Sequence, residues 1–77
     1  MKIKYFASLR EQANKNDEEI TEEFVNAFDL YQSLKEKYQF SLTVDQIKVA
    51  VNGEYQDFQT PIIAGDVITF IPPVAGG

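Results

Sequence analysis

The chain contains no histidine and no cysteine. Histidine is the most frequent general base in enzymes and a common metal ligand, and cysteine is the usual thiol nucleophile. The remaining carboxylates form no recognisable catalytic pair, so a self-contained enzyme is disfavoured. Without cysteine there can be no disulfide and no thiolate-bound metal, and we expect no metal site.

Long apolar runs are missing too. No segment approaches the roughly 20 apolar residues that a membrane-spanning helix needs. The opening residues, MKIKYFASLREQ, lack the apolar stretch of a signal peptide. We therefore expect a cytoplasmic protein.

Positive charge is scarce, with 7 Lys and Arg against 12 Asp and Glu and a net charge of −5. Nucleic acids and anionic membranes are bound through basic surfaces, so neither is an expected partner. The acids concentrate in DEEITEE, residues 17–23. This stretch is most simply a solvated edge of the fold. The alternative is an acidic docking surface for a basic partner.

A compact core is expected, because 44% of the residues are hydrophobic and the aromatics comprise 4 Tyr and 6 Phe. A chain of 77 residues makes one domain. Alternating or helical periodicity and turn signals predict strands at 2–7, 18–24 and 67–71, a hairpin at 47–58, a short helix at 8–14 and a long helix at 26–38.

Local signals support these assignments. Ser8 with Glu11 predicts a capping box for the short helix, and Asn26 predicts the cap of the long one. The dipeptide Asn52-Gly53 favours a type I′ hairpin turn. The order of elements indicates an α+β domain, in which one main helix crosses one face of a mixed sheet of four or five strands. A β-grasp (ubiquitin-like) roll fits this order.

The other face of such a sheet would be open. Ile68 and Phe70 are expected to point inward in the last strand, which turns Ile71 outward. Phe6 falls on the same side as the lysines of the first strand, and Ile62 is a candidate to join these two residues. A cluster of exposed apolar side chains predicts a partner surface. The alternative is that the inward and outward faces are exchanged.

The sequence finishes on FIPPVAGG. Pro72 and Pro73 cannot donate to a sheet ladder, so they should end the last strand. We expect residues 72–77 to form a flexible tail that narrows toward Gly76 and Gly77. The α-carboxylate of Gly77 is ionised at neutral pH and unreactive until it is activated. Adenylation by ATP would make it an electrophile toward sulfur or toward a lysine amine.

These stretches resemble the MoaD/ThiS sulfur-carrier family, which includes small subunits of molybdopterin synthase. The resemblance rests on YFASLREQ (5–12), VNGEY (51–55), TPIIAGD (60–66) and FIPPVAGG (70–77). It implies a single β-grasp domain over 1–77. It also implies a non-catalytic, sulfur-donating role in a transferase complex.

For the tail, the resemblance implies that an E1-like adenylyltransferase and sulfurtransferase uses Mg-ATP to adenylate Gly77, which is then converted to a thiocarboxylate. The tail (Pro73, Val74, Ala75, Gly76) would insert into the molybdopterin synthase large subunit, in a heterotetramer of two small and two large subunits. Sulfur would pass to cyclic pyranopterin monophosphate and form the molybdopterin dithiolene. No cofactor would be bound by this chain itself.

The family docks its partners through apolar sheet residues, and the matching positions are Phe6, Ile62 and Ile71. Three alternatives stay open. One is a carrier for another pathway, such as that of the thiamine thiazole. Another is a ubiquitin-like modifier, although such tails commonly carry arginine where this chain has Ala75. The third is a binding module whose terminal glycines are incidental.

Overall fold

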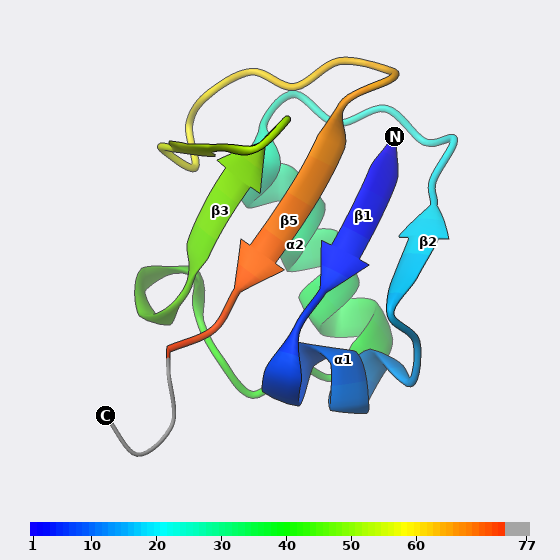
Figure 1. Ribbon diagram of the computed structural model, residues 1–77, viewed down its shortest axis with the longest axis vertical. Helices are drawn as coiled ribbons and strands as arrows, with labels where there is room; N and C mark the ends of the chain where they lie inside the picture. Colours follow the sequence, from blue (N-terminus) through cyan, green and yellow to red (C-terminus); the bar gives the residue numbers. More distant parts are fainter. Residues whose placement is uncertain (74–77) are drawn as a thin grey trace.

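The computed structural model describes residues 1–73, which fold into one layer of sheet and one of helix (Figure 1). In chain order the elements are β1 (Lys2–Tyr5), α1 (Ala7–Ala13), β2 (Asp17–Glu19), α2 (Ala27–Tyr38), the 3-10 turn η1 (Val44–Gln46), β3 (Lys48–Val51), β4 (Glu54–Gln56) and β5 (Val67–Ile71).

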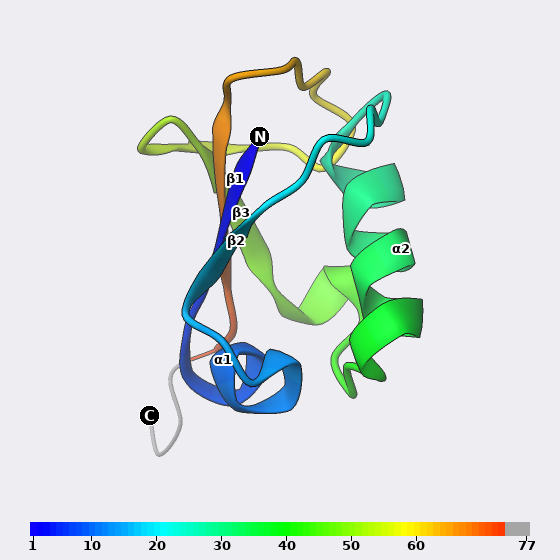
Figure 2. The ribbon, with the colours of Figure 1, turned by 90° about the vertical axis from the view of Figure 1, so that its right-hand side faces the viewer.

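The five strands form one mixed sheet in the order β2-β1-β5-β3-β4. β1 and β5 run parallel at its centre, and the other neighbouring strands are antiparallel. Helix α2 lies along one face, and no helix of residues 1–73 covers the other (Figure 2). The predicted α+β architecture, with a mixed sheet and one main helix across it, is confirmed.

Helix α2 begins where the sequence predicts. The side chain of Asn26 accepts a hydrogen bond from the backbone N–H of Asp29 at 2.9 Å, which satisfies one of the free donors of the first turn. The helix buries Leu30, Tyr31 and Leu34 at helical spacing. It ends at Gln39, whose φ of 60° is left-handed and whose N–H bonds back to Lys35.

The predicted capping box of the short helix is wrong. The N-cap is Phe6, with no side-chain cap, and Ser8 lies inside α1. The chain passes directly from β1 into the helix because Leu9 and Ala13 are buried against the sheet. A true capping box instead lies at η1, where Thr43 and Gln46 exchange hydrogen bonds.

The second strand is shorter than the predicted 18–24. Its antiparallel ladder pairs Asp17 with Lys4 and Glu19 with Lys2. Only Met1 precedes Lys2 of the partner strand β1, and its backbone carbonyl accepts a last hydrogen bond from the N–H of Ile20. The following acidic residues therefore continue as a loop at the end of the sheet.

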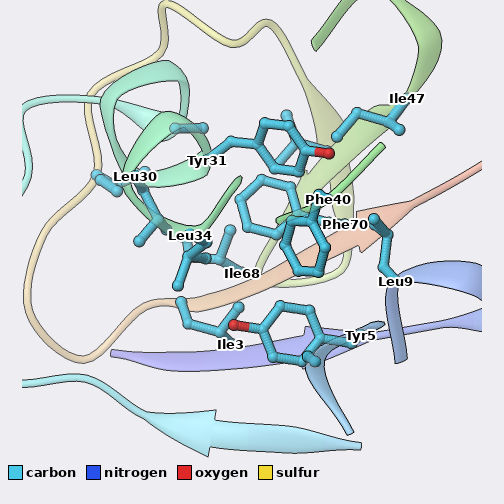
Figure 3. Packing of buried hydrophobic residues seen from close by; sticks show 14 residues of the cluster. Ile3, Tyr5, Leu9, Leu30, Tyr31, Leu34, Phe40, Ile47, Ile68 and Phe70 are labelled. Carbon is cyan, nitrogen blue, oxygen red and sulfur yellow. The ribbon is translucent and has the colours of Figure 1, made fainter. Parts of the chain in front are cut away.

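The core lies between α2 and the covered face of the sheet (Figure 3). Ile3, Tyr5, Ile68 and Phe70 enter it from the two central strands, as the alternation predicts for β5. Tyr31 packs against Phe70 with ring centroids 5.1 Å apart, and its hydroxyl donates to the carbonyl of Leu42 at 2.7 Å. Each such large side chain contributes about 1.5–3 kcal/mol through burial.

The predicted hairpin turn is confirmed at Asn52 and Gly53, which have φ of 53° and 88°. The Asn52 side chain also joins two turns. Its amide donates to a carboxylate oxygen of Asp66 at 2.9 Å, and its Oδ1 accepts from the N–H of Val67 at 2.9 Å. This contact fixes the β3–β4 hairpin against the start of β5.

A carboxylate sits at the edge of the covered face. Glu18 accepts hydrogen bonds from the hydroxyls of Tyr5 at 2.5 Å and Tyr38 at 2.6 Å, and Lys15 and Lys37 lie within 4 Å of its other oxygen. Burial raises the pKa of this carboxyl, but the two tyrosines and the two lysines together hold the pKa below its usual range.

We expect this network to make stability depend on acid. Because the pKa of Glu18 is lower in the folded chain than the ordinary 4.5, its stabilisation is complete above that pH and is lost as the pH falls through the folded-state pKa. Glu18→Gln should lower the free energy of unfolding by about 1–3 kcal/mol at pH 7 and by much less at pH 3. Urea unfolding of both chains at the two pH values checks this; an equal cost at both would contradict it.

Candidate functional site

The candidate site lies at the end of strand β5. After Ile71 the chain reaches Pro72, which is buried, and Pro73, which is exposed. Both prolines line a hollow of about 310 Å³ together with Ile71 and Tyr55. Predicted tail residues Val74, Ala75, Gly76 and Gly77 lie outside the described residues.

The strand register identifies the residues of the open face beside this exit. The parallel pairing of Tyr5 with Phe70 brings the next residue, Phe6, alongside Ile71. Phe6 has extended backbone, so its side chain points away from that of the buried Tyr5, and it is 47% exposed. Ile71 is half-buried. The predicted exposure of Phe6 is confirmed, and Ile71 lies on the open face as expected.

Ile62 does not belong to this face. It is only 6% exposed, lies in the core, and donates its N–H to the carbonyl of Val25. The expectation that it joins the exposed cluster is wrong. The loop of residues 57–66 has no periodicity to show its inward side, and its neighbour Ile63 is the exposed one, at 71%.

Tyr55, and not Ile62, is the third apolar side chain on the open face beside Phe6 and Ile71. It pairs with Ala50, and Ala50 pairs with Thr69 of β5, so all three are on the open face. Tyr55 is 69% exposed and lines the hollow with Ile71. The two-residue turn at Asn52-Gly53 fixes this register, so the signal was present in the sequence. We call Phe6, Tyr55 and Ile71 the open-face patch.

Charged side chains of both signs border the open-face patch. Lys4 pairs with Thr69, and Lys48 pairs with Ile71, on the same side of the sheet. Both lysines are exposed. Two acids lie beside them: Asp17 is opposite Lys4 in the sheet, and Asp45 lines the hollow. The arrangement is an apolar centre with a rim of mixed charge, next to the end of β5. Such a surface suits a partner with an apolar centre and a polar rim.

Among residues 1–73 there is no group of three or more Asp, Glu, His or Cys side chains that could hold a metal ion. No helix of the described part of the chain is long and apolar enough to cross a membrane.

A mixed sheet of this order, with a long helix across one face, defines a ubiquitin-like β-grasp fold. The ThiS family model matches residues 3–77. The chain belongs to the ThiS family.

Individual relatives agree with this assignment. The molybdopterin synthase sulfur carrier subunit of Escherichia coli K12 is 29% identical over 80 residues, covering 100% of this chain and 99% of the relative. SAMP1 from Haloferax volcanii, a small archaeal modifier protein, superposes with a TM-score of 0.79 at 27% identity, covering 99% of this chain and 97% of that one. A complex of subunits 1 and 2 of the molybdopterin-converting factor from Helicobacter pylori contains a chain with a TM-score of 0.68 and 26% identity, with coverage of 99% and 96%.

Proposed function

We propose that this chain is the sulfur carrier subunit of a molybdopterin synthase. The observation that carries the proposal is the ThiS family match, which runs through Gly77. The similarity to the Escherichia coli sulfur carrier subunit over the whole chain supports the particular pathway. The absence of histidine and cysteine is consistent with a carrier whose reactive group is a backbone carboxylate.

The proposed chemistry takes place on Gly77. Its carboxylate attacks the α-phosphate of Mg-ATP on an E1-like activating enzyme, which gives an acyl-adenylate and releases pyrophosphate. A sulfur donor then displaces AMP and leaves a thiocarboxylate. That sulfur passes to cyclic pyranopterin monophosphate, and two transfers build the molybdopterin dithiolene. Mg-ATP belongs to the activating enzyme, and this chain binds no cofactor of its own.

The proposed partner of the open-face patch is the large subunit of the synthase. The Helicobacter pylori complex of subunits 1 and 2 supports a partner of this kind. Docking of the patch would direct Pro73, Val74, Ala75 and Gly76 into the large subunit, so that Gly77 reaches the pterin. Two small and two large subunits would form the complex. The catalytic side chains would belong to the large subunit.

A protein modifier is the second candidate function. The similarity to SAMP1, a small archaeal modifier protein, favours it. It would use the same adenylate, but a lysine amine of a target protein would attack Gly77 and form an isopeptide bond. A carrier for the thiamine thiazole would share the thiocarboxylate and differ in the acceptor. Synthase activity with the large subunit separates the leading proposal from both.

Deleting Gly77 should abolish sulfur transfer, because the shortened tail no longer places its carboxyl group at the reacting position. One residue added after Gly77 should do the same, because it blocks the carboxyl while keeping the tail. The free energy of unfolding should change by less than about 0.5 kcal/mol in both. Synthase assays and urea unfolding measure these effects, with Glu36→Gln as an active control. Full activity from the chain lacking Gly77 would overturn the proposal.

Charge introduced into the open-face patch should weaken binding to the large subunit. Phe6→Glu or Tyr55→Glu should raise the dissociation constant about tenfold or more, as expected for a central aromatic contact. Both residues are exposed, so the fold should persist. Val25→Glu, at a side chain 73% exposed but remote from the patch, is the matched control. Titration calorimetry measures the affinities. Unchanged binding by both patch variants would show that the large subunit docks elsewhere.

A further inference from the structure

A second hollow lies at the opposite end of the sheet from the tail. It has a volume of about 380 Å³ and is lined by Met1, residues 19–24 and residues 62–64. The loops that form it, after β2 and before β5, meet at the end of the sheet where β1 and β5 begin (Figure 1). We call it the distal groove.

The floor of the distal groove is apolar. Ile62 is part of the core, and Ile20 and Phe24 are partly buried against that core. On the rim, Ile63 is 71% exposed. An apolar side chain of a partner could therefore leave water by packing on the floor and against Ile63.

The rim is acidic, and Lys2, which pairs with Glu19 across the strands, does not line the groove. Glu19 lies 3.8 Å from the amino group of Met1. Glu22 and Glu23 are exposed and form no ion pair within residues 1–73, and no lysine or arginine lines the groove. Three carboxylates thus face one ammonium group. The field of this rim repels phosphates and anionic lipids and attracts cationic side chains.

We propose that the distal groove binds a segment of another protein that presents an apolar side chain flanked by lysine or arginine. The apolar side chain packs on the floor, and its cationic neighbours reach Glu22 and Glu23. This gives a role to Glu19, Glu22 and Glu23, to which the sulfur chemistry gives none. The other acids of the stretch 17–23 lie elsewhere: Glu18 is bound by two tyrosines, and Asp17 is opposite Lys4.

The two surfaces can be occupied together. The five residues of β5 separate them by about 16 Å at the usual rise of a strand. A protein held at the distal groove would leave Pro73 and the open-face patch free. The proposal goes beyond the sulfur-carrier function and does not depend on it.

The test uses the full chain, labelled with ¹⁵N, and the acetylated, amidated tripeptide Lys-Leu-Lys as the probe. Amide shifts should change in residues 20–24 and 62–64 and should leave residues 48–56 unaffected. Glu22→Gln with Glu23→Gln should weaken binding about fivefold, as expected for two exposed ion pairs. Glu11→Gln with Glu36→Gln changes the net charge equally and should leave the affinity unchanged. Ile63→Ser should also weaken binding.

Several results would overturn the proposal. One is that the peptide Glu-Leu-Glu binds as tightly as Lys-Leu-Lys, and another is that the control pair of substitutions weakens binding as much as the pair at Glu22 and Glu23. The proposal also fails if Lys-Leu-Lys shifts only amides of the open face, or shifts none at millimolar concentration. Sedimentation of the free chain tests another occupant. A dimer that is lost with Glu22→Gln and Glu23→Gln would show that the groove receives a second copy instead.

Discussion

The parallel pairing of β1 with β5 is the contact on which the rest of the structure depends. It joins the two ends of the described chain, from Lys2 opposite Val67 to Tyr5 opposite Phe70. This register turns Ile3, Ile68 and Phe70 together into the core, where α2 covers them. It also sets the opposite residues on the open face. A shift by one residue would exchange the two sets, exposing the core side chains and burying lysines.

The same pairing separates the two candidate binding surfaces, which lie at opposite ends of the central strands. Where β5 ends, Pro72 and Pro73 leave the ladder beside Phe6 and Tyr55, so a partner on the open face would be guided toward the tail. Where β5 begins, the clasp between Asn52 and Asp66 holds the hairpin against the strand. The acidic loop after β2 lies at this end because its partner strand stops there. The central strands therefore hold the open-face patch and the distal groove apart.

Sequence patterns predicted the elements that carry strong local signals. The alternation of residues in β5 predicted which side chains point into the core. Helical spacing together with the cap residue Asn26 predicted α2, and Asn52-Gly53 predicted the turn of the hairpin. Errors arose where distant contacts decide the outcome. Ser8 lies within α1 because the burial of Leu9 moves the start of the helix, and Ile62 is buried where its loop is hydrogen-bonded to the backbone carbonyl of Val25. Tyr55 could have been found from the turn register. The distal groove could not, since it forms from two loops that meet only in the fold.

The proposal that Gly77 carries sulfur can be tested by mass spectrometry. The chain is incubated with ATP, its activating enzyme and a sulfur donor, and its intact mass is determined. The account predicts replacement of one oxygen by sulfur, located at Gly77 by fragmentation and dependent on ATP. An unchanged mass, or attachment of the chain to lysines of other proteins as its main product, would contradict it.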